Sequence, residues 1–303
     1  KGDSIMQNNE QLDVLYKFKK EVEKSNNERL VHIINQVIKK VYLNQYTLSF
    51  VGHFSAGKST LINLILEQDI LPSSPVPTTS NTAIVSVSEK EEIIANLEDQ
   101  KYAKLKTYDD VKTMNLLNID VESIEIKFPS NKFNLGFTLQ DTPGVDSNIS
   151  THQSTTEQFL YTSNMIVYTV DYNHVQSALN FQFMKRMNQV GIPIIFVINQ
   201  IDKHNKNEIS FDTFKQRVEQ SIQDWDINIA QLFYVSKFNH PENQLHLFSK
   251  FLVEKDKHRE PIEDFVTRTI EFINSSQLSY IQDHMQNILD ELNISEPEFE
   301  ETY

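Results

Sequence analysis

The stretch Gly52-His53-Phe54-Ser55-Ala56-Gly57-Lys58-Ser59 lies between an apolar, strand-like run at 46–51 and a helical run at 58–68. It matches the pattern G-x-x-x-x-G-K-[ST], in which a glycine-bearing loop brings backbone N–H groups close to phosphates. The amino-terminal end of the following helix adds the positive end of its dipole to the same anion. This order of strand, loop and helix predicts an α/β nucleotide-binding fold.

Two further motifs follow the phosphate loop, each at the end of another strand-like run. Asp141-Thr142-Pro143-Gly144 comes after the run 137–140, and Asn199-Gln200-Ile201-Asp202 comes after the run 194–198. A single short motif can arise by chance. The three motifs in this order predict a protein that binds GTP.

The residue types in these motifs fit the chemistry of a guanine nucleotide. Lys58 is expected along the β- and γ-phosphates, and the Ser59 hydroxyl is expected to ligate Mg²⁺. Asp141 is placed to hold the same ion directly or through water, and the N–H of Gly144 is expected to meet the γ-phosphate. The Asp202 carboxylate can accept from two guanine donors at once. Adenine does not offer both donors, so the carboxylate would be left unpaired.

The composition argues against several classes of protein. The net charge of −14 opposes nucleic acid as the main partner, because phosphate neutralisation needs a basic face, and no polybasic membrane patch is visible. No apolar run approaches the roughly 18 residues needed to span a bilayer, and no signal peptide is visible. The absence of cysteine excludes disulfides and thiolate metal sites and fits a reducing, cytoplasmic compartment. The first residue is Lys1 rather than Met, so we expect a fragment of a longer protein.

From about residue 46 to residue 254, strand-like runs alternate with helical runs, which is the pattern of a parallel α/β sheet. Strands are expected near 46–51, 83–87, 123–128, 136–141, 165–171, 194–199 and 232–236, and helices near 58–68, 151–162, 177–190, 210–224 and 243–254. The interval between Lys58 and Asp141 is wider than a minimal Ras-like GTPase requires. We expect the segment 89–117 to fill it with a polar hairpin around 93–95 and a helix capped at Thr107.

Two amphipathic stretches flank this α/β region. Apolar residues recur at helical spacing from Leu30 to Val41 and again from Ile262 to Leu292. A helix of about 35 residues would extend about 50 Å, beyond the width of a small domain. We favour a helical bundle in which both stripes pair, and two helices packed on the flank of the α/β core are the alternative. The expected domains are bundle helices at 1–43 and 258–293, a GTPase domain at 44–257, and a disordered acidic tail at 294–303.

The segment 52–63 resembles the first motif of the dynamin superfamily of large GTPases, and it is most similar to bacterial dynamin-like proteins and the mitofusin branch. Pro77-Thr78-Thr79-Ser80 resembles their switch I, and Val235-Ser236-Lys237 resembles their fifth motif, where backbone N–H groups meet the guanine carbonyl. The terminal helices resemble the bundle that joins a dynamin head to its stalk. The resemblance implies a cytoplasmic GTPase that dimerises head to head across the nucleotide. It also implies peripheral attachment to a membrane, which the protein remodels or tethers through regions mostly outside this chain.

The same resemblance assigns roles to individual residues. Thr79, or its neighbour Thr78, would place the attacking water through its carbonyl and bind Mg²⁺ through its hydroxyl. Ser55 is similar to the dynamin serine that helps to hold K⁺ or Na⁺ in place of an arginine finger. With the motif chemistry above, the expected catalytic residues are Ser55, Lys58 and Thr79, and the expected Mg²⁺ ligands are Ser59, Thr79 and Asp141. The expected nucleotide contacts are Gly52, Phe54, Ser55, Ala56, Gly57, Lys58, Ser59, Thr60, Thr78, Gly144, Asn199, Gln200, Asp202, Ser236 and Lys237.

Three differences from related GTPases bear on these roles. Phe54 occupies a position that is polar in many dynamins, which bears on cation-assisted hydrolysis, and Gln200 replaces the lysine that packs over the base. Val145 follows Asp-Thr-Pro-Gly, so the glutamine that positions water in Ras-like enzymes is absent. Catalysis must then rest on positioning and on charge compensation supplied partly by a dimer. A regulatory or ribosome-assembly switch GTPase and a GTP-binding scaffold with little turnover are the alternative functions.

Overall fold

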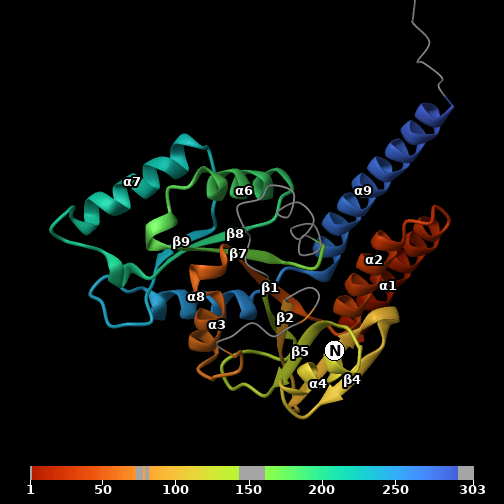
Figure 1. The fold of residues 1–303 in the computed structure, drawn as a ribbon, viewed down its shortest axis with the longest axis horizontal. Coiled ribbons are helices and arrows are strands. Elements are labelled where there is room, and N and C mark those ends of the chain that lie inside the picture. The colour runs from red at the N-terminus through yellow and green to blue at the C-terminus, as the bar shows by residue number, and fades with distance from the viewer. Residues whose placement is uncertain (1, 73–77, 79–81, 143–160, 293–303) are drawn as a thin grey trace, which may run out of the picture. The chain divides into compact units, whose positions relative to one another are not determined.

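The computed structural model describes residues 2–72, 78, 82–142 and 161–292 (Figure 1). The chain divides into two compact units, one made of residues 1–42 with 261–303 and one made of residues 43–260. The second unit holds a β-sheet with its helices, and the first holds helices from both ends of the chain. Residues 151–160 of the helix predicted at 151–162 lie outside the described residues, and so does the predicted acidic tail. Residues 161 and 162 form a turn.

Nine strands form one sheet in the described part of the α/β unit. They are β1 (Tyr46–Val51), β2 (Thr82–Val87), β3 (Glu92–Leu97), β4 (Tyr102–Leu105), β5 (Val121–Phe128), β6 (Phe137–Asp141), β7 (Met165–Asp171), β8 (Ile194–Asn199) and β9 (Gln231–Tyr234). Their spatial order is β4-β3-β5-β2-β6-β1-β7-β8-β9. The strands β6, β1, β7, β8 and β9 run parallel, so their carboxyl ends share one edge of the sheet. In open α/β sheets that edge is where ligands bind.

The other half of the sheet contains the insertion that separates the phosphate loop from Asp141. β2 pairs antiparallel with β6 and parallel with β5, while β3 pairs antiparallel with both β5 and β4. The hairpin predicted around 93–95 is present as β3 and β4. The predicted helix cap at Thr107 is wrong, because α4 (Asp110–Leu116) begins at Asp110. The Asp110 carboxylate accepts from the N–H groups of Lys106 and Thr107 at 2.8 and 3.0 Å, so this carboxylate holds the turn that precedes the helix.

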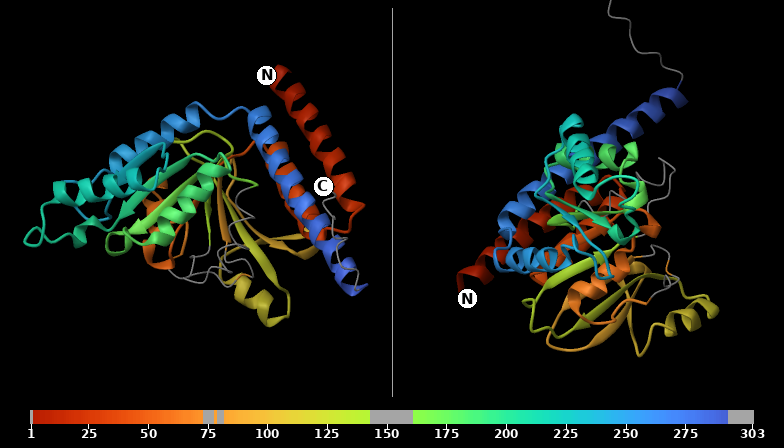
Figure 2. Two further views of the ribbon diagram at one scale, coloured as in Figure 1. Left: turned by 90° about the horizontal axis from the view of Figure 1, so that it is seen from above. Right: turned by 90° about the vertical axis from the view of Figure 1, so that its left-hand side faces the viewer.

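Helices cover both faces of the sheet (Figure 1, Figure 2). On one face lie α3 (Lys58–Leu66) and α8 (Leu245–Lys257), and the ring centroids of Phe248 in α8 and Phe50 in β1 are 6.5 Å apart. On the other face lie α6 (Ala178–Gln189) and α7 (Phe211–Asp224), and Phe183 of α6 stacks on Tyr168 of β7 at 4.8 Å. Within the described residues, four 3₁₀ turns lie between the helices and strands, namely η1 (Phe54–Ala56), η2 (Glu98–Gln100), η3 (Tyr172–His174) and η4 (Ile201–Lys203). The predicted α/β class with a mostly parallel sheet is confirmed.

The terminal helices pack with one another inside their own unit. They are α1 (Gly2–Glu23), α2 (Glu28–Tyr42) and α9 (Ile262–Glu291), and each contacts the other two. The apolar stripe of α2 is buried, and so are Phe265, Val266 and Ile273 of α9. Gln277 of α9 accepts from Asn27 at 3.0 Å and donates to Ser25 Oγ at 2.6 Å, which ties α9 to the turn between α1 and α2. The α2 stripe and the first half of the α9 stripe therefore pair in a bundle, as predicted. The second half of the α9 stripe does not, since Ile281, Ile288 and Leu292 are exposed. Within the described ranges, no helix is both long and apolar enough to span a bilayer.

Candidate nucleotide-binding site

The phosphate loop leaves the carboxyl end of β1 and turns through η1 into α3. Gly52 has a φ of +152°, and a Cβ there would lie 1.9 Å from the carbonyl oxygen of Thr169 in β7. Gly57 has a φ of +80°, and a Cβ there would lie 2.7 Å from Asn199 Nδ2. Both positions therefore require glycine, which lets the loop pack closely against β7 and against the loop after β8.

Lys58 begins α3 and is buried, with 5 % of its surface exposed. Its Nζ donates to the carbonyl oxygens of Gly52 at 2.9 Å and His53 at 3.0 Å, so the backbone of the loop fixes the ammonium. Burial lowers the pKa of Lys58 to about 8, and the nearby Asp141 carboxylate partly opposes this shift. A bound phosphate would supply negative charge to a cation that is largely removed from water.

Ser59 and Asp141 form the part of the site that suits a divalent cation. The Ser59 hydroxyl donates a short hydrogen bond to the Asp141 carboxylate. Burial raises the pKa of Asp141, while the hydrogen bond from Ser59 and the charge of Lys58 oppose the rise. Hydroxyl and carboxylate oxygens are ligands that Mg²⁺ takes in proteins, so this pair fits the ion. The Thr78 hydroxyl is buried without a hydrogen-bond partner among the described residues, whereas Thr79 and Gly144 lie outside them.

The last residue of β8 and the loop after it reach both the phosphate loop and the candidate base site. Asn199 donates its side-chain amide to the carbonyl oxygen of Ala56 at 2.8 Å, and Gln200 donates to that of Ser55 at 3.0 Å. Asp202 accepts from the Ser236 hydroxyl at 2.6 Å, which links this loop to the segment after β9. The Gln200 amide is thus bonded to the phosphate loop, whereas the lysine of the family pattern packs over the base.

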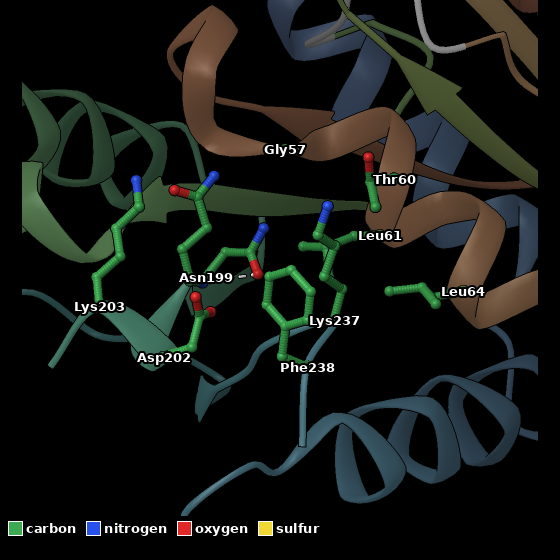
Figure 3. A pocket seen from close by; sticks show the side chains of 10 residues that line it. Gly57, Thr60, Leu61, Leu64, Asn199, Asp202, Lys203, Lys237 and Phe238 are labelled. Carbon is green, nitrogen blue, oxygen red and sulfur yellow. Dashed lines mark hydrogen bonds between the residues drawn. The ribbon is translucent and has the colours of Figure 1, made fainter. Parts of the chain in front are cut away.

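A cavity of about 270 Å³ lies between α3 and the loops that follow β8 and β9 (Figure 3). The predicted contact residues that line it are Gly57, Thr60, Asn199, Gln200, Asp202 and Lys237. The remaining lining residues were not predicted, and they are Leu61, Leu64, Lys203 and Phe238. Apolar walls with a few convergent polar groups are typical of a ligand site. Ser236 does not line the cavity but contacts Asp202. The neighbouring phosphate loop and its partners contain the predicted residues Gly52, Lys58, Ser59 and Asp141.

Ser55 lies in a small polar cluster beside the phosphate loop. Its hydroxyl lies 2.8 Å from His53 Nδ1 and donates to Asp171 Oδ2 at 3.4 Å. Asp171 is buried at the carboxyl end of β7, and its Oδ2 lies 2.7 Å from His174 Nδ1. Our sequence reasoning missed Asp171 and His174. A carboxylate at the end of a strand next to β1 is the signal that could have found Asp171. Phe54, on the same loop, is 70 % exposed.

Comparison with known proteins identifies relatives of this chain. The sequence profile of the Dynamin family matches residues 48–202, about half of the chain. The chain is 30 % identical to Dynamin-like protein A of Bacillus subtilis over 233 residues, which cover 75 % of this chain and 19 % of that protein. It is 22 % identical to a probable transmembrane GTPase of the FZO-like kind, chloroplastic, from Arabidopsis thaliana, over 52 % of this chain and 15 % of that protein. The chain therefore spans a fifth or less of the length of these two relatives.

A solved structure of a bacterial dynamin shares the fold. It is reported as an oligomerised bacterial dynamin pair that provides a mechanism for the long-range sensing and tethering of membranes. Its TM-score is 0.56 at 16 % identity, over 96 % of this chain and 59 % of that chain. The profile match runs from β1 to Asp202 and so includes the phosphate loop, Asp141 and the loop after β8. Motifs, fold and sequence agree, and the chain belongs to the dynamin family.

Proposed function

We propose that this chain is the GTPase head of a larger dynamin-type protein and that it binds GTP and hydrolyses it with Mg²⁺. One observation carries the proposal. The phosphate loop leads directly into the buried Lys58 and into Ser59, which bonds to Asp141. The Asn199–Ala56 hydrogen bond joins this loop to the loop that presents Asp202. A phosphate site and a carboxylate suited to guanine are therefore connected on one edge of the sheet.

Asp202 would supply the preference for guanine. Its Oδ1 accepts from Ser236, and its other acceptor positions are available to the two N–H donors of guanine. An adenine nucleotide would leave the carboxylate unpaired, which is an effective way to reject a ligand. Because the Ser236 hydroxyl restrains the carboxylate, less ordering is required when the base binds.

Lys58 and the N–H groups of the phosphate loop would bind the phosphates, and Ser59 and Asp141 would hold Mg²⁺. When bound, Mg²⁺ neutralises the charge that develops on the phosphate oxygens. The switch threonine, Thr79 or its neighbour Thr78, would be a further ligand and would orient the attacking water through its carbonyl. Gly144 would donate its N–H to the γ-phosphate. This threonine is needed because Val145 replaces the water-positioning glutamine of Ras-like enzymes.

We further propose that Ser55 helps to hold K⁺ or Na⁺ and that two copies of the chain pair through the nucleotide face. The Ser55 hydroxyl and the Asp171 carboxylate are 3.4 Å apart, and two such oxygens suit a hard cation. A cation and a partner subunit would provide the charge compensation that the missing glutamine and arginine finger leave open.

The proposed domains are bundle helices at 1–43 and 258–293 around a GTPase domain at 44–257. Membrane contact would be peripheral and would come through regions mostly outside this chain. The reported membrane tethering by the related bacterial dynamin pair supports this proposal. A scaffold that binds GTP with little turnover is a second candidate, because Val145 stands where Ras-like enzymes have the water-positioning glutamine.

Phosphate release from GTP, measured over a range of protein concentrations in K⁺, Na⁺ and a non-coordinating cation, tests the proposal. We expect a specific rate that rises with concentration and depends on the cation. A rise without cation dependence would keep the dimer and remove the role of Ser55. A flat, very slow rate would favour the scaffold. Thr79→Ala should retain GTP binding and lose turnover, and the same result for Thr78→Ala alone would make Thr78 the switch residue.

A further inference from the structure

We propose that Phe238 is the surface on which the guanine base stacks, in place of the lysine that Gln200 replaces. This inference rests on the proposed function, because it requires that the cavity binds a guanine nucleotide. It assigns the recognition of the flat face of the base to the segment after β9, while Asp202 recognises the edge.

The position of Phe238 is the first argument. Its side chain lines the cavity together with Asp202, Leu61 and Leu64, and in Figure 3 the ring lies between the Asp202 carboxylate and Leu64. Phe238 is 56 % exposed. Single exposed apolar side chains are common and need no explanation. This one is the only aromatic side chain among the described residues that line the cavity, and a planar base is the natural ligand for its open surface.

The backbone of Phe238 is the second argument, because it is held in place from two sides. Its N–H donates to Ser236 Oγ at 3.0 Å, and its carbonyl oxygen accepts from Asn243 Nδ2 at 3.1 Å. The same Ser236 hydroxyl donates to Asp202 at 2.6 Å. One hydroxyl therefore links the backbone that carries the Phe238 ring to the Asp202 carboxylate. A site that contacts both the face and the edge of one base requires such a link.

The neighbours of the ring are the third argument. Lys237 Nζ lies over the ring at 4.9 Å from its centroid, and this cation–π contact orients the ring. Gln200, which follows Asn199 where the family pattern has its stacking lysine, donates its amide to Ser55 instead. Gln200 therefore does not give the base the apolar cover that the lysine stem gives in the family pattern. Phe238 is placed to supply it from the loop after β9.

Truncation of the ring tests the inference directly. Aromatic stacking on a base is worth about 5- to 150-fold in affinity by alanine substitution, so Phe238→Ala should raise the Kd for GDP by a factor in this range. Phe238→Tyr should bind GDP like the unaltered chain, and Phe238→Leu should bind weakly, since it keeps an apolar side chain but no flat face. Tyr102→Ala is the matched control, because Tyr102 is an aromatic residue, 65 % exposed, in β4 at the opposite edge of the sheet from β9.

Two further measurements separate stacking from a general disturbance of the site. Inorganic triphosphate has no base, so its affinity in competition should be the same for Phe238→Ala and the unaltered chain. The chain has one tryptophan, Trp225, so Phe238→Trp in a Trp225→Phe background places a single indole at the cavity. Its fluorescence should be quenched by GDP and not by inorganic triphosphate.

The outcomes separate this inference from the proposed function. An unaltered chain that binds no guanine nucleotide would overturn the proposed function, and the inference with it. An unaltered chain that binds GDP, with an unchanged or lower Kd in Phe238→Ala, would overturn the stacking role alone. A lower Kd would show that the ring obstructs the cavity. Equal loss of GDP and inorganic triphosphate would also overturn it, since the ring would then support the phosphate site.

Discussion

The charge state of Lys58 should make nucleotide affinity depend on pH above neutrality. Burial lowers the pKa of this lysine to about 8 in the free protein. Bound phosphates favour the charged ammonium, so the pKa of Lys58 is expected to be higher in the complex. Between the two pKa values the complex holds a proton that the free protein has lost, and binding must take up that proton. Affinity should therefore fall as pH rises through this interval.

The magnitude follows from the free pKa. At pH 7 nearly all of the lysine is protonated, and at pH 9 about one molecule in ten carries the proton. The Kd for GDP should therefore increase about tenfold between pH 7 and pH 9, which is about 1.4 kcal/mol. Calorimetric titration in two buffers of different ionisation enthalpy should show an uptake of about 0.9 proton at pH 9 and about 0.1 proton at pH 7.

Two variants distinguish Lys58 from other titrating groups, including the guanine base itself. Lys58→Arg keeps a permanent charge, so its Kd should lack the lysine-dependent rise. The Asp141 carboxylate raises the pKa of Lys58, so Asp141→Asn should shift the pH dependence of the Kd to lower pH. A Kd that is constant from pH 7 to pH 9, or binding without proton uptake at pH 9, would refute the reasoning. An identical slope in Lys58→Arg would assign the effect to another group.

Four other substitutions have expected outcomes. Asp202→Asn should weaken GTP binding and improve the binding of xanthosine triphosphate in competition. The reason is that an amide can donate to a base carbonyl, whereas the carboxylate only accepts. An unchanged preference for GTP over xanthosine triphosphate would remove Asp202 from the base site. Gly57→Ala should lower GTP affinity and destabilise the fold by about 1–3 kcal/mol in thermal unfolding, since the left-handed backbone and the contact with Asn199 both oppose a Cβ. Ile273→Ala, at a fully buried position of α9, should cost about 2–5 kcal/mol in urea unfolding. Ile281→Ala, at a position that is 40 % exposed, should change stability by about 0.5 kcal/mol or less.

The sequence predicts the strands of the parallel half of the sheet because their signal is local. Ile194–Asn199, for example, is a run of β-branched and apolar residues that ends in a polar motif, and every residue of β8 is buried. The antiparallel direction of β2 against β6 has no local signal, since partner and direction are decided by contacts between distant segments. The start of α4 was missed for a related reason. The Asp110 carboxylate bonds to backbone N–H groups that precede it, and such a bond competes with an ordinary cap at Thr107.

The candidate site shows the same division between local and distant information. Lys58, Ser59 and Asp202 are predictable because their spacing within short motifs carries the chemistry. Asp171 and Phe238 belong to no such motif. Asp171 is 116 residues from Ser55 in the sequence, and the two meet only because β7 lies next to β1. Phe238 reaches the cavity because a hydrogen bond from Ser236 to Asp202 connects the segments after β9 and β8.

The replacement of lysine by Gln200 has a structural consequence beyond the loss of a stacking group. The adjacent amides of Asn199 and Gln200 donate to the adjacent carbonyl oxygens of Ala56 and Ser55. A lysine at position 200 could also donate to a carbonyl, but its stem could not then lie over the base. With glutamine, the loop proposed to read the base is bonded twice to the loop proposed to bind the phosphates. A displacement of either loop must therefore break these two hydrogen bonds or move the other loop with it. Under the proposed function, base recognition and phosphate placement would then be mechanically coupled.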